Sequence, residues 1–381
     1  MIIARFLKSN FQQTLDSFLQ EIGLDEEEAA KPGDGMTLEA ILEERRMFSV
    51  SPEYELVQEI QEEETLPYPC VPQLLEGISS NVLFITVVNA NEIPYIVTAC
   101  ADRTLCIHHG ETLKLTRVLS DLHPSPILSV MEDNGFLVTA GMDGCVHVVN
   151  FETGSVHRTL KQHDKYAVHL KTSSKHLVTA GYDKRIHVYG PRGDTWLGTI
   201  ELSSNPEALL LTEADQKDVL IVSKRDSTFL YYYDLANLPN PLRQYNLAEQ
   251  GSWVSFCCGD IARSPTHPQQ YGVVTTSAPT MRFLYLDHSS VEPNVVQNAR
   301  TGAPQDNYSS PRCCFRPSGD AVWVNSDDGV IRAINIQTGK IDVELKKHDG
   351  RVKALWAGML HGKEVLLSGG MADSSVCVWK A

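Results

Sequence analysis

The sequence lacks the features that mark membrane-spanning and secreted proteins. It contains no run of about 18 apolar residues, so no transmembrane helix and no membrane association are expected. Arg5 and Lys8 interrupt the first residues before any apolar stretch forms, so we expect no signal peptide. The nine cysteines do not have the regular spacing of a disulfide framework. Free thiols and a cytoplasmic or nuclear location are therefore expected.

Positive charge is also scarce in this chain. The formal net charge is -15, and residues 1–66 hold 16 of the 48 acidic side chains but 5 of the 33 basic ones. A phosphate backbone would be repelled by this first part and hardly attracted by the rest. We expect no nucleic-acid partner. The acidic segment is interpreted as a solvated face, with a specific basic partner as the alternative.

Motifs for catalysis and cofactor binding are missing from the sequence. There is no G-x-x-x-x-G-K-[ST], no G-x-G-x-x-G at a strand–helix junction and no G-x-S-x-G. The adjacent cysteines at 257–258 and 313–314 lack the C-x₂-C spacing of zinc sites, so we expect them to pack in buried first strands. His108 and His109 have no neighbours at ligand spacing and are expected at the surface. The sequence predicts no enzyme, cofactor or metal site.

An internal repeat is the main feature that the sequence does contain. Residues 95–109, 136–150 and 176–190 align without gaps, each with an apolar strand, a short turn and an alternating strand. This pattern is typical of β-hairpins. Weaker copies follow. The equivalent turn position is occupied, in order along the chain, by Asp102, Asp143, Asp183, Asp226, Pro279, Asp328 and Asp373.

These seven units predict a mainly β protein with a seven-bladed β-propeller. Their spacing of roughly 40 to 53 residues is that of four-stranded propeller blades. The last unit ends after its third strand, whereas residues 68–79 precede the first unit as a spare segment. We expect this segment to supply the missing outer strand and close the ring. The predicted propeller therefore spans residues 68–381.

The repeats resemble the WD-repeat family over residues 68–381. That family has a His before the first strand of a blade, Ser or Thr in the second, Asp in the turn and often Trp in the third. The resemblance implies a buried hydrogen-bond network that fixes blade geometry and takes no part in catalysis. The matching residues are His123, Thr139 and Asp143, then His163, Thr179 and Asp183, and in the last blade His348, Ser368, Asp373 and Trp379.

The first 24 residues have the pattern of two short helices. Their apolar residues recur at helical spacing, residues 8–10 separate the two stripes, and Gly23 is a natural end. The segment resembles the LisH (lissencephaly-protein homology) motif, which implies homodimerisation through a small four-helix bundle. Packing against the chain's own propeller is the alternative. The residues expected at the dimer interface are Ile3, Phe6, Leu7, Phe11, Leu15, Phe18, Leu19 and Ile22.

Residues 25–67 are predicted to form an acidic linker with two amphipathic helices. One is expected from residue 37 to 48, and the other begins at Ser51-Pro52, with Ser as the cap and Pro in the first turn. No heptad pattern persists for three repeats, so a long coiled coil is not expected.

The arrangement of a LisH-like arm before a propeller implies a non-catalytic scaffold that binds other proteins. Ubiquitin-ligase assembly is favoured, with microtubule–dynein regulation or transcriptional corepression as alternatives, and a propeller enzyme or small-molecule binder as the alternative from another class. In this family the loop before each first strand opens on one face around the central channel. Aromatic residues and Arg dominate binding hot spots. Those expected to contact partner proteins on this face are Lys165, Tyr166, Trp253, Tyr308 and Arg351.

Overall fold

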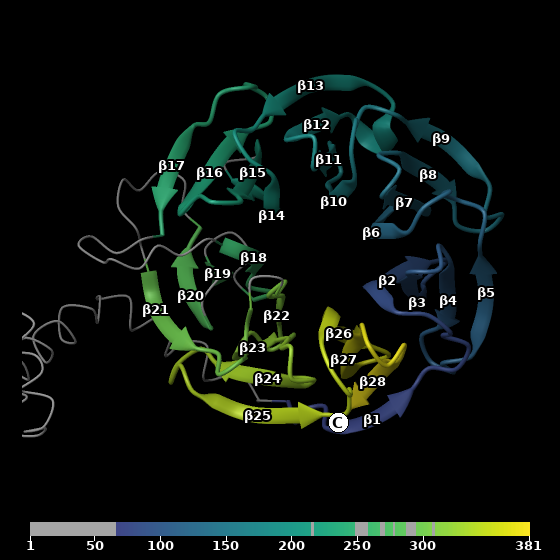
Figure 1. Ribbon diagram of the computed structural model, residues 1–381, viewed down its shortest axis with the longest axis vertical. Helices are drawn as coiled ribbons and strands as arrows, with labels where there is room; N and C mark the ends of the chain where they lie inside the picture. The colour runs from purple at the N-terminus through teal and green to yellow at the C-terminus, as the bar shows by residue number, and fades with distance from the viewer. Residues whose placement is uncertain are drawn as a thin grey trace, which may run out of the picture. The chain divides into compact units, whose positions relative to one another are not determined.

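The computed structural model describes residues 66–214, 217–247, 258–266, 271–276, 279–286, 295–306 and 309–381. In these residues the predicted fold class is confirmed, because seven four-stranded antiparallel sheets form the ring of a propeller (Figure 1). One short 3₁₀ turn, η1 (Pro191–Gly193), follows β12. The predicted helical arm and the linker helices, within residues 1–65, lie outside the described residues.

Each blade runs from an inner strand to an outer strand in chain order. Blade 1 comprises β2 (Val82–Ala90), β3 (Ile93–Cys100), β4 (Leu105–His109) and β5 (Leu115–Leu119). Blade 2 comprises β6 (Ile127–Asp133), β7 (Phe136–Gly141), β8 (Val146–Asn150) and β9 (Val156–Leu160). Blade 3 comprises β10 (Ala167–Thr172), β11 (Leu177–Gly181), β12 (Arg185–Tyr189) and β13 (Trp196–Glu201). Blade 4 comprises β14 (Pro206–Ala214), β15 (Lys217–Lys224), β16 (Phe229–Asp234) and β17 (Arg243–Asn246).

The remaining three blades follow the same plan. Blade 5 comprises β18 (Cys258–Arg263), β19 (Tyr271–Thr276), β20 (Thr280–Tyr285) and β21 (Val295–Arg300). Blade 6 comprises β22 (Cys313–Phe315), β23 (Ala321–Val324), β24 (Val330–Asn335) and β25 (Ile341–Lys346). Blade 7 comprises β26 (Val352–Leu360), β27 (Lys363–Gly370) and β28 (Val376–Lys380) from the end of the chain, with β1 (Val71–Leu74) as its fourth strand.

The ring is closed by pairing between the two ends of the propeller sequence. β1 lies antiparallel to β28, with Val71 opposite Lys380 and Leu74 opposite Cys377 (Figure 1). β1 comes from the spare segment ahead of the first repeat. Because an unpaired edge strand exposes free backbone donors and acceptors, this pairing also protects the edge of the last blade.

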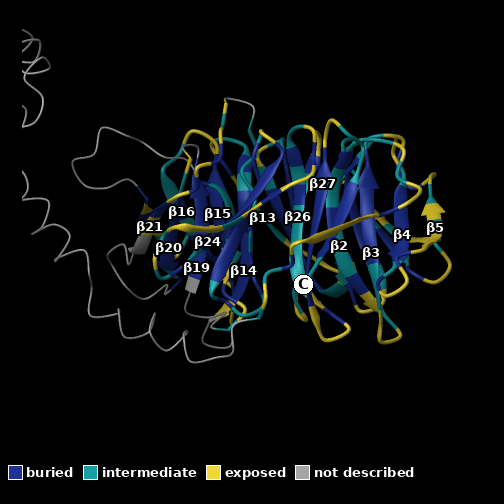
Figure 2. Cartoon of the chain, turned by 90° about the horizontal axis from the view of Figure 1, so that it is seen from below, coloured by how far each residue is buried: buried dark blue, intermediate teal, exposed yellow. Residues whose placement is uncertain are grey.

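The hydrophobic core lies between neighbouring blades. All residues of β11 and all of β23 are buried, since each middle strand is covered on both faces by adjacent sheets. The middle strands β15 and β27 are likewise largely buried (Figure 2). Such strands read as continuous runs of Val, Leu and Ala and do not alternate. The outer strands β5 and β9 do alternate and leave Leu115 and Val156 exposed. The sequence pattern therefore changes from continuous to alternating as the chain moves outward through a blade.

The expectation that His108 lies at the surface was wrong. Its side chain is fully buried in β4, and its Nε2 atom lies 2.8 Å from the carbonyl oxygen of Glu76. The segment that follows β1 passes over this strand, and burial lowers the pKa of the ring. Burial of the paired cysteines was correctly predicted for Cys258 in β18 and Cys313 in β22, whereas Cys314 is only partly buried and Cys257 lies outside the described residues.

Candidate partner-binding face and central channel

Three blades contain a buried His–Asp–hydroxyl network at the predicted positions. In blade 2, His123 Nδ1 lies 3.0 Å from an Asp143 carboxylate oxygen, and its Nε2 lies 2.8 Å from Thr139 Oγ1. Blade 3 repeats this geometry: His163 Nδ1 lies 3.0 Å from Asp183, and its Nε2 lies 2.9 Å from Thr179. Asp143 also accepts the amide of residue 145, so it fixes its own turn.

Blade 7 extends the network by one residue. His348 Nδ1 lies 2.8 Å from Asp373, and His348 Nε2 lies 2.8 Å from Ser368 Oγ. Trp379 Nε1 donates to the same hydroxyl at 2.9 Å. The network links the loop before the first strand, the second strand, the turn and the third strand, so it holds the loop face of the blade in place.

Two of the network carboxylates, those of Asp183 and Asp373, are stabilised as anions. Burial opposes ionisation of Asp183, but hydrogen bonds from His163 and from the amides of Asp164 and Arg185 outweigh it and lower its pKa. Asp373 behaves in the same way beside His348, with a lowered pKa. Both carboxylates accept hydrogen bonds from the network histidine and from amides of their own blade.

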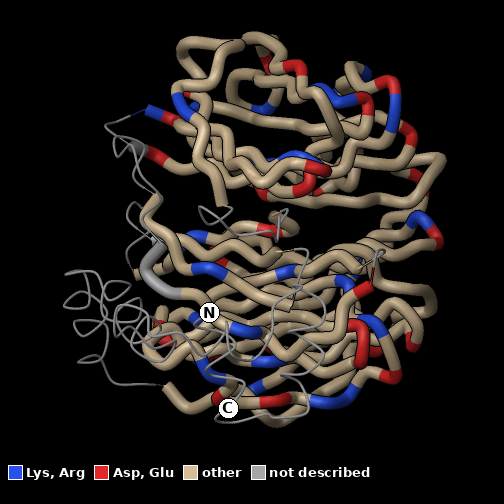
Figure 3. The backbone as a smooth tube through the Cα atoms, turned by 60° about the vertical axis from the view of Figure 1, so that its left-hand side comes forward, with Lys and Arg blue, Asp and Glu red and all other residues tan. Residues whose placement is uncertain are grey.

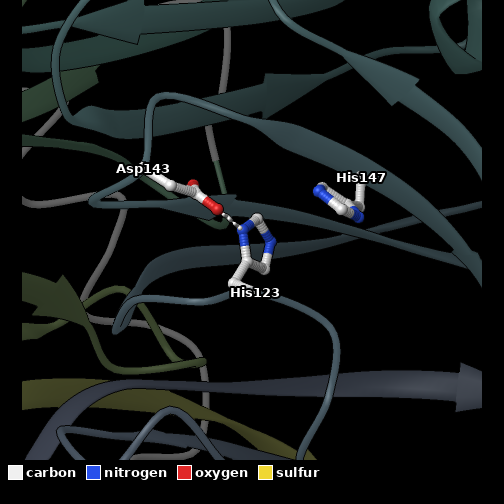
Figure 4. A group of neighbouring side chains, drawn as sticks. All are labelled: His123, Asp143 and His147. Carbon is white, nitrogen blue, oxygen red and sulfur yellow. Dashed lines mark hydrogen bonds and ion pairs between the residues drawn. The ribbon is translucent and has the colours of Figure 1, made fainter.

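A second histidine lies next to the network in blades 2 and 3. The His147 ring lies beside His123, which faces Asp143 (Figure 4). Potential ligand atoms of these three residues lie within 4.8 Å of one another, and so do those of the equivalent trio in blade 3. Two imidazoles and a carboxylate are a donor set that zinc accepts, so the hydrogen bonds decide whether this set fits a metal.

The hydrogen bonds of His123 and His187 do not favour a metal at these trios, although the buried Nδ1 atom of His147 has no hydrogen-bond partner among the described residues. Both ring nitrogens of His123 are already bonded, and in blade 3 His187 bonds to Thr199 Oγ1 at 2.8 Å and to the Gln162 carbonyl oxygen at 3.2 Å. A metal would have to displace these bonds. Burial, followed by repulsion from the neighbouring histidine, lowers the pKa of His147 and of His187 to about 4. We interpret both as neutral rings that pack on the network histidines.

Main-chain hydrogen bonds bring the predicted partner-binding loops into register. The carbonyl oxygen of Pro126 accepts the amide of Met142 at 3.0 Å, and that of Tyr166 accepts the amide of Tyr182 at 2.9 Å. The same contact holds Arg351 in blade 7, where its carbonyl oxygen accepts the amide of Met371 at 2.9 Å. Residues at this position in different blades are therefore structurally equivalent and lie on one face of the propeller.

An exposed aromatic and cationic cluster lies on this face at blades 3 and 4. The Tyr166 side chain is 46% exposed, and its ring lies 6.3 Å from that of Tyr182. The guanidinium carbon of Arg225 lies 5.5 Å from the centre of the Tyr182 ring, and Arg225 donates a hydrogen bond to Glu207. Lys165 is exposed beside Tyr166. We call Lys165, Tyr166, Tyr182 and Arg225 the tyrosine cluster.

Arg351 is placed differently from Tyr166 despite its equivalent backbone position. Its guanidinium forms ion pairs with Asp327 at 2.8 Å and Asp306 at 3.1 Å. These contacts leave 27% of its side chain exposed. Arg351 therefore presents a mixed-charge surface, whereas the tyrosine cluster presents aromatic rings.

The other predicted site residues do not fall in the described part of the chain. Trp253 and Tyr308 lie outside it, and so do the residues expected at the dimer interface, which are Ile3, Phe6, Leu7, Phe11, Leu15, Phe18, Leu19 and Ile22. Two members of the tyrosine cluster, Tyr182 and Arg225, were not among the sequence predictions. Each directly precedes a turn aspartate of the repeat, so this turn position could have identified them.

A cavity of about 340 Å³ lies where the innermost strands of all seven blades meet. It is lined by apolar side chains from blades 1 and 2 and by charged side chains from blades 3, 5, 6 and 7. The inner strands that contribute to it surround the centre of the ring in Figure 1. This volume is within the range of small-molecule sites, so the channel is a second candidate site besides the loop face.

Comparison with known proteins supports the fold class. A protein-family model described as a beta-propeller domain matches residues 272–380, which include most of blade 5, all of blade 6 and strands β26 to β28 of blade 7. No curated protein matches the chain. Among the described residues, none forms a helix with the length and hydropathy that crossing a membrane requires. The fold and the family model together define a β-propeller protein, a class commonly built for protein interaction.

Proposed function

We propose that this protein is a non-catalytic interaction scaffold of the WD-repeat type, which binds partner proteins on the loop face of its propeller. The tyrosine cluster carries the proposal. It combines two tyrosine rings, an arginine and a lysine on one exposed face, and tyrosine and arginine are among the residue types enriched in binding hot spots. The buried networks supply rigidity behind it, since their polar atoms are used within each blade.

The proposal is tested by purifying the full chain with its partners from cells. Tyr166→Ala should remove a specific subset of copurified proteins, because it deletes the most exposed ring of the cluster. Trp196→Ala is the matched control, since Trp196 is 57% exposed on the outer strand β13, away from the loop face. An unchanged set of partners with Tyr166→Ala would contradict the assignment of this face.

The identity of the captured proteins distinguishes the kinds of assembly. We favour a ubiquitin-ligase-type complex in the cytoplasm or nucleus, in which case ligase subunits should copurify. Tubulin or dynein components would indicate the microtubule alternative, and histone-modifying subunits would indicate corepression. A screen for metal binding, nucleotide binding and enzymatic activity tests the non-catalytic assignment. Catalytic turnover in this screen would contradict it.

We also propose that residues 1–24 dimerise the scaffold as a LisH motif. The expected apolar stripe includes Leu15 and Phe18, and Gln13 falls on the opposite side of the predicted helix. Light scattering should give twice the chain mass for the full-length protein and one chain mass for Leu15→Asp/Phe18→Asp. Gln13→Asp introduces the same charge on the polar side and should leave the dimer intact. A monomeric wild-type chain would overturn the proposal.

A further inference from the structure

Positively charged side chains outnumber negatively charged ones in the lining of the central cavity. In the described part of the chain, the lining contains the cations Lys171, Arg263, Arg312 and Lys353 but a single carboxylate, that of Asp260. This is the reverse of the whole chain, whose net charge is -15. Along the described backbone, acidic and basic residues are otherwise interspersed (Figure 3).

The one carboxylate in the lining is already engaged. Asp260 Oδ1 lies 3.5 Å from Arg312 Nη1, and Asp260 Oδ2 accepts the Cys313 amide at 3.1 Å. Lys353 donates to a neutral hydroxyl, that of Ser310, at 2.7 Å. No described carboxylate forms an ion pair with Lys171 or Lys353. Within the described residues, the positive charge of the channel is therefore only partly compensated, by Asp260 for Lys171 and by Glu207 and Asp327 for Lys353.

The cations are close enough to repel one another. Burial, followed by the positive charges of Arg312 and Arg351, lowers the pKa of Lys353 to about 8. Burial lowers the pKa of Lys171 as well, and the charges of Arg312 and Arg263 add to this effect while the Asp260 carboxylate opposes it. Since an anion placed between like charges removes their repulsion, the channel is electrostatically suited to bind one.

The opposite side of the cavity is apolar. Leu83 from β2 and Leu128 from β6 line it and are only partly buried, so these side chains face the channel. Phe84 and Met131 complete this wall. A fully hydrated inorganic anion would leave the wall in contact with water, whereas a ligand with an apolar body would bury it.

We propose that the central channel binds a small amphipathic organic anion, with its acidic group at the cationic lining formed by Lys171, Arg312 and Lys353 and its apolar body against Leu83 and Leu128. The acidic group is a phosphate or a carboxylate, since lysine ammonium groups bind both. This inference goes beyond the scaffold role and does not depend on it, because the channel and the tyrosine cluster are formed by different residues.

Isothermal titration calorimetry of the full-length protein tests the proposal with octyl phosphate, octanoate and inorganic phosphate as probes. Either amphiphile should bind with a stoichiometry of one per chain, and the tighter one identifies the acidic group. Inorganic phosphate should bind at least about tenfold more weakly, because it cannot cover the apolar wall. Equal affinity for inorganic phosphate, or no binding of either amphiphile, would overturn the proposal.

Matched variants locate the ligand in the channel. Lys171→Met/Lys353→Met keeps side-chain length, removes both charges and should weaken the amphiphile about tenfold or more. Leu128→Ser should weaken the amphiphile but leave binding of inorganic phosphate unchanged. Lys114→Met removes an exposed charge of blade 1 outside the cavity and should have no effect.

Unchanged affinity in the double variant, with its fold verified by circular dichroism, would overturn the assignment. If a hexaglutamate peptide bound to the protein and neither amphiphile did, the assignment would also be overturned, and the channel would be a site for acidic peptides.

Discussion

Arg316 and Glu364 form a two-pronged ion pair in the seam between blades 6 and 7. The Nε–Oε1 distance is 2.9 Å, the Nη2–Oε2 distance is 2.7 Å, and the two side chains are 0% and 1% exposed. Arg316 also donates to Asp320 and to the carbonyl oxygen of Leu66, and its guanidinium lies 3.9 Å from the Tyr68 ring. One buried cation therefore joins blade 6, blade 7 and the segment that leads into the closing strand β1.

We expect Glu364→Ala to destabilise the propeller strongly. Removal of one partner leaves the other charge buried and incompletely paired, which costs about 3–5 kcal/mol in the free energy of unfolding. Urea unfolding followed by tryptophan fluorescence measures the loss. The exposed pair of Lys175 with Glu213 supplies the control, since both side chains are half exposed at a distance of 3.4 Å. Glu213→Ala should cost less than about 1 kcal/mol, and an equally small effect of Glu364→Ala would contradict the prediction.

The hydroxyl of Ser368 is expected to stabilise blade 7 through two hydrogen bonds. Ser368→Ala leaves the Trp379 N–H and His348 Nε2 buried without a partner, which should cost about 2 kcal/mol or more. Ser368→Thr retains the hydroxyl that Thr139 and Thr179 supply in blades 2 and 3, so it should keep most of the stability. Thermal unfolding distinguishes the two, and equal losses in both variants would exclude the hydrogen bonds as the cause.

Acid should destabilise the protein through its buried neutral histidines. The pKa of His187 is about 4 in the folded chain against an ordinary value of 6.5, because burial opposes its charge. Above pH 6.5 the ring is neutral in both states and contributes nothing to the pH dependence. As the pH falls from 6.5 to 4, the unfolded chain binds the proton first, so stability falls by at most about 3 kcal/mol.

The pH dependence is checked by measuring urea midpoints between pH 7 and pH 4 for the wild type and for His187→Gln. The variant retains hydrogen-bonding capacity toward Thr199 but has no titratable ring, so its midpoint should fall less over this range. Parallel curves for the two proteins would show that His187 does not contribute to the acid sensitivity.

The propeller could be predicted from the sequence because its blades depend on local pattern. An apolar run, a turn residue such as Asp143 and an alternating strand are encoded within about 15 residues. Repetition of this unit along the chain then indicates the number of blades. The equivalence of Tyr166 and Arg351 followed from counting from the network histidines, since the loop has the same length in both blades.

Contacts between blades could not be read from the sequence. Arg316 and Glu364 lie 48 residues apart on different blades, and nothing in their flanking sequence pairs them. The stacking of Arg225 on Tyr182 likewise depends on the side-by-side placement of two sheets. Lys171 and Lys353 occupy partly buried positions of inner strands in two different blades. The sequence does not show that they line the same channel, because this follows only from closure of the ring.

Ring closure by β1 should depend on which backbone amides of this strand face β28. Leu75 donates its amide to the Val376 carbonyl oxygen at 3.0 Å, and hydrogen-bonded positions alternate along an antiparallel ladder, so the Gln73 amide faces β28 as well. Pro72, which has no N–H, occupies the alternate position, as an edge strand requires. Gln73→Pro should therefore remove a ladder hydrogen bond and destabilise the protein by about 2–3 kcal/mol.

Leu74→Pro is the matched control for this closure, because residue 74 shares the outward-facing amide position of Pro72. It should cost clearly less than Gln73→Pro in urea unfolding. Hydrogen exchange gives an independent readout: amides of β28 that bond to β1 should exchange faster with Gln73→Pro, while amides of blade 2 keep their protection. If Leu74→Pro were the more damaging change, the amide of Leu74 and not that of Gln73 would face β28. The pairing of Gln73 with Val378 as a hydrogen-bonded position would then be wrong.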